Sequence, residues 1–265
     1  MIKITSLQAI AAALLACGLY VAPAQAGPNR TFVSGTGTDS GACTRAAPCR
    51  TFAFALTATN AGGEIDVLDA AGYGAVTITK AIGIVNDGVG VAAIGASSGN
   101  GVTINAGAFD SVHLRGLTIE GLGSGANGIL FNTGLSLAIE NCVVRGFANA
   151  GINIAPTGSA AVTGVLSKVI TSNNGDGIIV NGSSMTGASL KVTIVDSVAS
   201  NNGNIGIGPV TGGSGAFTTI MVRNSVASNN ASGLLAHNAI LVVAHSVVTG
   251  NAVGVQRETF GSIES

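Results

Sequence analysis

The chain has 265 residues, of which 47% are hydrophobic, 9% are charged and 40 are glycine, and its formal net charge is −1. It is too apolar for a disordered protein and too rich in glycine for a helical domain. Binding to a nucleic acid calls for an excess of lysine and arginine that this chain lacks, so we expect no nucleic-acid partner.

Residues 1–26 have the pattern of a cleaved secretory signal peptide. Lys3 provides a basic start, residues 7–22 are apolar, and residues 24–26 (AQA) form a small-x-small cleavage site. A lipoprotein signal that modifies Cys17 is the alternative, which the continuation of the apolar stretch past this residue disfavours. We expect export to the periplasm, the outer surface or the extracellular space, and no later stretch has the length and apolarity of a transmembrane span.

Two cysteines follow the cleavage site, within a segment that we expect to form an N-terminal cap over residues 27–63. Cys43 and Cys49 bracket the short polar sequence CTRAAPC. In an exported protein this arrangement favours a disulfide between them. Cys142 lies in an apolar stretch and is expected to be a buried free thiol.

The cap is also expected to contain a short helix over residues 50–61, ending at Gly62-Gly63. Its apolar face would consist of Phe52, Ala55, Leu56 and Thr59. Such a face can cover the open apolar end of a repeat structure, as terminal caps do in solenoids.

Residues 64–265 contain a repeat, which is best preserved in the hexapeptide SVASNN at residues 197–202 and again at 225–230. The longer units that contain it start at residues 113, 138, 165, 193, 221 and 242. A period of this size predicts a solenoid. The apolar pieces are short, rich in Val, Ile and Thr, and bounded by Gly, Asn or Ser, which favours strands. A leucine-rich horseshoe would need a repeated leucine framework, which is missing.

The chain resembles secreted bacterial right-handed parallel β-helix proteins of the pectin-lyase-like type, over nearly all of its mature length. The resemblance rests on polar corner residues before an apolar strand, Asn141 in IENCVV, Asp196 in IVDSVA and Asn224 in VRNSVA, and on the opening segment from Arg30. It implies an all-β, right-handed parallel β-helix of about 7–8 turns, without a further domain boundary. This fold hosts lyases, hydrolases, adhesins and structural proteins, so it does not define a function.

Lyases of this family combine carboxylates that hold calcium with a basic residue that abstracts a proton. In the repeat alignment, charges of opposite sign instead stack as Arg115 with Glu140, Glu120 with Arg145, and Lys168 with Asp196. These are typical of ordinary cross-strand ion pairs. Calcium takes six to eight oxygens, and no column of the alignment has two carboxylates.

The sequence gives equally little support for a catalytic role of other residues. Glu64, Asp66 and Asp69 come nearest to an acid and base pair, but they lie beside the cap. The three histidines show no metal-binding spacing, and the eight Phe lie mostly at core-like positions. We therefore expect no catalytic residue, no metal site and no cofactor.

The recurring Gly-Ile-x-Ile strand predicts the face that binds a partner, because its residues alternate between the interior and the surface. The inward column is Ile129, Ile152, Ile178, Ile207 and Leu234, and the outward column is Leu130, Asn153, Ile179, Gly208, Leu235 and Gln256. Leu130, Ile179 and Leu235 would form an apolar stripe for a protein partner or a second copy. The alternative is scattered surface aliphatics of no consequence.

The predicted function is thus an exported, non-catalytic β-helix scaffold that binds a cell-surface glycan, another protein or itself. The alternative is a polysaccharide lyase or glycoside hydrolase with a shallow cleft.

In the repeated hexapeptide, we expect Val198 to face the interior of the stack.

Overall fold

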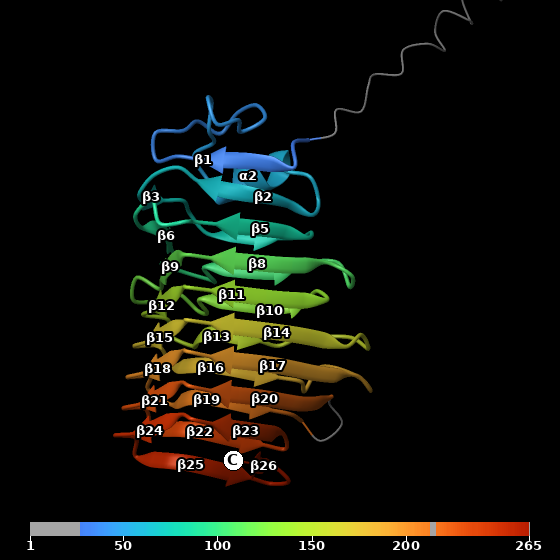
Figure 1. The fold of residues 1–265 in the computed structure, drawn as a ribbon, viewed down its shortest axis with the longest axis vertical. Coiled ribbons are helices and arrows are strands. Elements are labelled where there is room, and N and C mark those ends of the chain that lie inside the picture. Colours follow the sequence, from blue (N-terminus) through green and yellow to red (C-terminus); the bar gives the residue numbers. More distant parts are fainter. Residues whose placement is uncertain (1–26, 213–215, 265) are drawn as a thin grey trace, which may run out of the picture.

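A computed structural model describes residues 27–212 and 216–264, so the predicted signal peptide lies outside the described residues. The described chain forms a coil of short strands that stack along one axis (Figure 1). All pairings between its named strands are parallel, and each strand pairs with its equivalents in the turns above and below. The predicted all-β parallel β-helix is confirmed.

Three sheets make up the coil. The first sheet contains β1 (Arg30–Val33), β2 (Gly63–Val67), β5 (Ile82–Val85), β8 (Ser111–Arg115), β11 (Ser136–Glu140), β14 (Val162–Ser167), β17 (Ser189–Val195), β20 (Phe217–Arg223), β23 (Ile240–Ala244) and β26 (Ser262–Glu264). The second contains β4 (Val76–Ile78), β7 (Val102–Asn105), β10 (Ile129–Thr133), β13 (Ala150–Ile154), β16 (Asp176–Asn181), β19 (Ile205–Val210), β22 (Ser232–His237) and β25 (Val253–Glu258). The third contains β3 (Ala71–Gly72), β6 (Ala92–Gly95), β9 (Leu117–Glu120), β12 (Val143–Arg145), β15 (Ile170–Ser172), β18 (Val198–Ser200), β21 (Val226–Ser228) and β24 (Val247–Thr249).

Left-handed backbone at fixed positions produces the corners between the first and third sheets. Asn141, Asp196 and Asn224 have φ values of 53°, 52° and 51°, and Lys168 and His245 occupy the same corner with φ of 53° and 50°. Asparagine and aspartate tolerate this conformation better than other residues with a side chain. The polar corner positions predicted from the sequence are therefore confirmed.

The repeated hexapeptide SVASNN forms one corner, a third-sheet strand and the next corner. The first asparagine of each copy, Asn201 or Asn229, has φ of 55°. The second asparagine is buried and belongs to a ladder that joins consecutive turns. In that ladder, the backbone N–H and the Nδ2 of Asn202 both donate to Oδ1 of Asn230 at 3.0 Å. The 28-residue spacing of the two copies brings these amides into contact.

The side-chain direction expected for this strand is wrong. Ala199 is fully buried and faces the core, whereas Val198 is half-buried on the outer face. The reason is that the alternation starts at Ser197, whose side chain is buried at the corner and donates from Oγ to the carbonyl of Val195 at 2.8 Å. The small alanine thus occupies the interior position.

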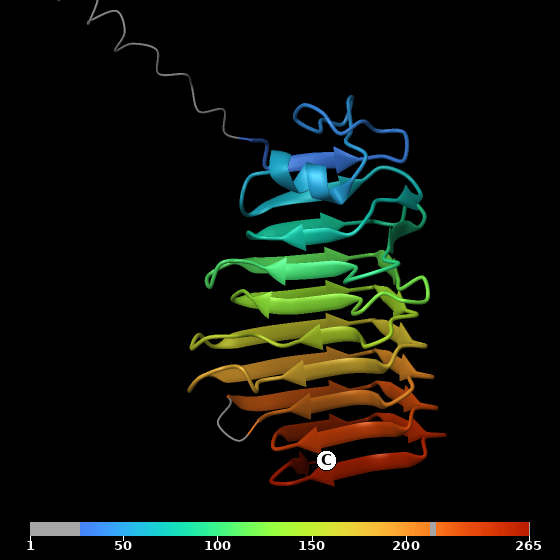
Figure 2. The same cartoon turned by 180° about the vertical axis from the view of Figure 1, so that it is seen from behind.

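The predicted N-terminal cap is formed by helix α2 (Phe52–Ala58), which lies at the start of the coil (Figure 2). Thr51 is its N-cap and accepts a hydrogen bond from the backbone N–H of Phe54 at 3.2 Å. The helix is shorter than expected because Thr59 has extended backbone and donates its hydroxyl to the carbonyl of Ala55 at 2.6 Å. The predicted inner face is buried as expected and consists of Phe52, Ala55, Leu56 and Thr59.

Both cysteine predictions agree with the structure. Cys43 and Cys49 form a disulfide with a Cα–Cα distance of 4.9 Å. Cys142 is a buried free thiol, and burial raises its pKa to about 11.

Candidate functional site

The outward column predicted on the second sheet exists, because the strand register pairs Leu130 with Asn153, Asn153 with Ile179, and Ile179 with Gly208. Leu235 pairs in the same way with Gln256. However, the column exposes little apolar surface. Ile179 exposes 9% of its surface and Leu235 exposes 7%, so their side chains are largely covered although they point outward.

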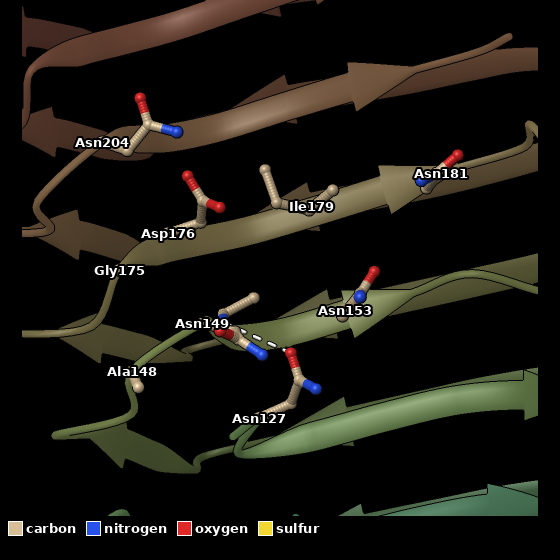
Figure 3. A pocket seen from close by; sticks show the side chains of 10 residues that line it. Asn127, Ala148, Asn149, Asn153, Gly175, Asp176, Ile179, Asn181 and Asn204 are labelled. Atoms are coloured by element: carbon tan, nitrogen blue, oxygen red, sulfur yellow. Dashed lines mark hydrogen bonds between the residues drawn. The ribbon is translucent and has the colours of Figure 1, made fainter. Parts of the chain in front are cut away.

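A shallow groove of about 510 Å³ lies on the outer face of this sheet and includes two of the predicted binding residues, Asn153 and Ile179. It is lined by Asn127, Ala148, Asn149, Ala150, Asn153, Gly175, Asp176, Ile179, Asn181 and Asn204, and Figure 3 shows these side chains along adjacent turns. The other predicted residues, Leu130, Leu235 and Gln256, lie outside this lining. We call this feature the asparagine groove.

The lining of the asparagine groove includes a glycine between two asparagines. Asn149, Gly175 and Asn204 lie in adjacent turns at the same register, as shown by the pairing of Ala150 with Asp176 and by the 2.7 Å bond from the N–H of Asn204 to the carbonyl of Gly175. A Cβ at Gly175 would collide with the carbonyl oxygen of Ala148. Glycine at this position is therefore required by the close approach of the turns.

Hydrogen bonds to the backbone of the next turn orient several of the lining side chains. Asp176 accepts from the N–H of Ile205 at 3.0 Å, and Asn127 accepts from the N–H of Ala150 at 3.3 Å. Asn153 differs, because its Oδ1 is buried and has no hydrogen-bond partner in the described part of the chain. Buried polar atoms are normally paired, so the unpartnered oxygen of Asn153 is an exception among the described residues.

The groove is nearly uncharged. Its polar side chains are five asparagines and one aspartate, Asp176, and Ile179 contributes an apolar part of the floor. Asparagine side chains offer two donor hydrogens and one acceptor oxygen each. The surface can therefore form many directional hydrogen bonds to a neutral polar ligand.

The three pairs of charges predicted to stack lie in register in adjacent turns, and two of them form ion pairs. Nε of Arg145 lies 2.9 Å from Glu120, and Nε of Arg115 lies 3.9 Å from Glu140. The third pair, Lys168 and Asp196, lies at one corner in adjacent turns as expected, but within residues 27–212 and 216–264 no salt bridge joins the two side chains, and Asp196 instead accepts a hydrogen bond from Nδ2 of Asn224. The confirmed pairs lie at the surface, where ion pairs contribute little to stability.

The carboxylates beside the cap have structural partners. Arg30 of β1 forms ion pairs with Asp66 and, at 3.4 Å, with Glu64. Asp69 accepts hydrogen bonds from the hydroxyl of Ser34, the N–H of Gly35 and the hydroxyl of Tyr73 at 2.6–2.7 Å. These bonds lower the pKa of Asp69. The three carboxylates therefore hold the first strand and the cap in place.

No group of three His, Cys, Asp or Glu in the described ranges is arranged to hold a metal ion. Nor does any helix there have the length and apolar character needed to cross a bilayer.

Exposed aromatic rings are a feature that sequence reasoning missed. Phe109, Phe217 and Phe260 expose 90%, 84% and 91% of their surfaces, although phenylalanine was expected mostly in the core. Phe52, Phe131 and Phe147 do have core positions. The exposed rings lie where second-sheet strands lead into the first sheet, away from the asparagine groove.

Comparison with known proteins supports the fold. No family model matches the chain, and no curated protein does. Among solved structures, the crystal structure of pectate lyase Pel9A is similar, with a TM-score of 0.61 and 18% sequence identity. The similarity covers 84% of this chain and 63% of that chain, so the chain spans less than two thirds of the lyase's length. The chain thus shares a parallel β-helix fold with this structure.

Proposed function

We propose that the protein is an exported β-helix that binds a carbohydrate chain in the asparagine groove without cleaving it. The observation that carries this proposal is the lining of the groove by Asn127, Asn149, Asn153, Asn181 and Asn204. Sugar hydroxyls both donate and accept hydrogen bonds, and amide side chains match them in both roles.

The charge of the groove favours a neutral sugar over an acidic one. Asp176 is the charged residue of the lining, and its carboxylate would repel the carboxylate of a uronic acid. The floor provided by Ile179 suits the apolar face of a sugar ring. The ligand class is therefore a neutral polysaccharide, such as one exposed on a cell surface.

Export is supported by the disulfide between Cys43 and Cys49, because such bonds persist in oxidising compartments outside the cytosol. The signal-like residues 1–26 support the same location. We infer that mature protein begins at Gly27 and acts in the periplasm, on the outer surface or outside the cell.

The alternative function is a polysaccharide lyase or glycoside hydrolase, which the similarity of the fold to pectate lyase Pel9A favours. Hydrolysis of a glycosidic bond commonly uses two carboxyl groups on either side of the bond. The asparagine groove contains one, Asp176, whose Oδ1 is engaged by the N–H of Ile205. Binding without cleavage therefore agrees better with the side chains of this groove.

A glycan array tests both functions, with the purified protein applied in the presence and absence of calcium. We expect retention on neutral polysaccharides that calcium does not change. Asn153→Ala and Asn204→Ala should each weaken this binding at least tenfold, which is the effect of losing about 1.4 kcal/mol. The matched control is Asn132→Ala, which removes an outward amide of β10 that lies outside the groove.

Three results would contradict the proposal. One is an absence of binding to every neutral glycan, and another is binding that the groove variants leave unchanged. The third is release of new sugar chain ends from a bound polysaccharide, with loss of this release in Asp176→Asn. That last result would establish the enzyme in place of the binding protein.

A further inference from the structure

The C-terminal half of the first sheet has an apolar outer surface. We define the first-sheet face as the outward side chains of β14, β17, β20 and β23, which lie side by side in Figure 1. Its central column consists of Val165, Thr193, Met221 and Val242, which pair in register across the four strands. Val165 and Met221 expose 50% and 44% of their surfaces, and Phe217 at the start of β20 exposes more. Apolar side chains thus remain accessible over several turns.

The charged residues of the first-sheet face are both positive. Lys191 of β17 and Arg223 of β20 are exposed, and the four strands contain no Asp or Glu. Within the described residues, neither cation takes part in an ion pair. Asp196, at the corner beyond β17, instead accepts a hydrogen bond from Asn224. The apolar column is therefore accompanied by positive charge that no ion pair neutralises.

The N-terminal half of the same sheet has a different character. Its outward charges have both signs and form ion pairs with one another, and they include Arg30, Glu64, Asp66, Arg115 and Glu140. Opposite charges in this half compensate each other. Attraction for a negatively charged partner is therefore concentrated on the first-sheet face.

The size of the first-sheet face limits what can cover it. The distance from Phe217 to Arg223 is about 20 Å along β20, and the four strands span about 14 Å in the other direction. The product of these lengths is about 300 Å². A stable protein interface commonly buries about 800 Å² on each partner. A second copy is also disfavoured, because association through this face would bring four unpaired cations together.

We propose that the first-sheet face binds the surface of a membrane that contains anionic lipids. Such peripheral binding combines the burial of apolar side chains with the attraction of basic residues to anionic headgroups. Phe217 and Met221 supply the apolar contact, and Lys191 and Arg223 contact the lipid phosphates. The second sheet faces the viewer in Figure 2, on the other side of the coil from the first sheet. Membrane binding would therefore leave the asparagine groove accessible.

A tryptophan at position 217 tests the apolar contact, because the chain contains no tryptophan of its own. The emission of Phe217→Trp should shift to shorter wavelength on addition of vesicles of phosphatidylglycerol and phosphatidylcholine. Brominated lipids in these vesicles should quench it. Ile170→Trp is the matched control, since Ile170 is an exposed apolar residue on the third sheet. Its emission should not change.

Sedimentation with the same vesicles measures the contribution of charge. Lys191→Glu and Arg223→Glu should each lower the affinity at least fivefold, because a basic residue near an anionic surface contributes about 1 kcal/mol. Arg257→Glu, which changes an exposed cation of the second sheet, should leave the affinity unchanged. Binding of the unsubstituted protein should weaken as the salt concentration rises. Circular dichroism verifies that each variant is folded.

Several results would overturn the proposal. They are an absence of binding of the unsubstituted protein to anionic vesicles at low salt, equal binding to phosphatidylcholine alone, and equal emission shifts at positions 217 and 170. An emission shift of Phe217→Trp that follows protein concentration without vesicles would identify a second copy as the occupant, and would also overturn it.

Discussion

The buried asparagine ladder should be a main source of stability for the central turns, and Asn202→Ala is the change that tests it. Oδ1 of Asn202 accepts from both the backbone N–H and the Nδ2 of Asn174 at 3.2 Å. Its Nδ2 donates to Asn230 at 3.0 Å and to the carbonyl of Thr171 at 3.4 Å. Asn202 itself is 2% exposed, so water cannot easily replace these bonds.

The expected cost follows from the groups that the substitution leaves without a partner. The backbone N–H of Asn174 loses its acceptor, and a buried unsatisfied donor costs about 1–3 kcal/mol. The three other side-chain bonds contribute about 0.5–1 kcal/mol each when lost. We therefore expect Asn202→Ala to lower the free energy of unfolding by about 2.5–6 kcal/mol.

Urea unfolding followed by circular dichroism measures this change as a shift of the midpoint at an unchanged slope. Asn204→Ala is the control, since Asn204 is an exposed asparagine only two residues away. Surface substitutions of this kind usually change stability by less than about 0.5 kcal/mol. Equal midpoints for the two variants would refute the stabilising role of the ladder.

Three further substitutions or measurements test the packing. Ala199→Asp places an unpaired charge in the core and should prevent folding, whereas Val198→Asp on the outer face should leave a folded protein; solubility and circular dichroism distinguish them. Cys142 should resist thiol labelling in the native state and react fully in denaturant, because burial raises its pKa; rapid native labelling would contradict this. Hydrogen bonds lower the pKa of Asp69 in the folded protein. The carboxylate therefore contributes to the free energy of unfolding above its unfolded pKa of about 3.9, and this contribution is lost as the pH falls through the folded pKa. The difference in melting temperature between the unsubstituted protein and Asp69→Asn should thus be largest near neutral pH and shrink in acid, and a pH-independent difference would disprove it.

Periodicity made the coil and its corners predictable from the sequence. A residue that recurs once per turn has the same backbone conformation in each turn, so Asn141, Asp196 and Asn224 identified one corner. The two copies of SVASNN likewise identified a strand with its flanking corners. These features depend on local backbone preferences and on the spacing, both of which are visible in a single sequence.

Exposure was less predictable because it depends on neighbouring turns. The alternation along a strand correctly predicted that Ile179 and Leu235 lie on the outer face. It did not predict how little of each side chain is accessible. Phe217 and Phe260 show the opposite difference, because their residue type suggests burial and yet they are exposed. They lie at the ends of turns, a position that residue type does not indicate. Val198 was misplaced because its apolarity suggested the core, whereas the corner at Ser197 determines the direction of the strand.

The asparagine groove was found only in part, since its shape depends on residues that lack a functional signature. Gly175 lies between Asn149 and Asn204 in adjacent turns, where a Cβ would collide with the backbone of the neighbouring turn. A single sequence shows this glycine as one of 40 and does not mark it as special. Only the register between turns reveals that the two asparagines on either side of it face the same space.

The corner that stabilises the coil also orients the groove. Asn174 is buried in the ladder, and the next two residues, Gly175 and Asp176, emerge on the outer face as part of the groove lining. A bond from Asn174 to the carbonyl of Val144 at 3.3 Å holds this corner against the turn before it. Because backbone hydrogen bonds fix the spacing of turns, the amides of the groove have fixed separations before any ligand arrives. A ligand that matches this spacing would bind without a cost for ordering the surface, which is the physical advantage of a β-helix as a binding scaffold.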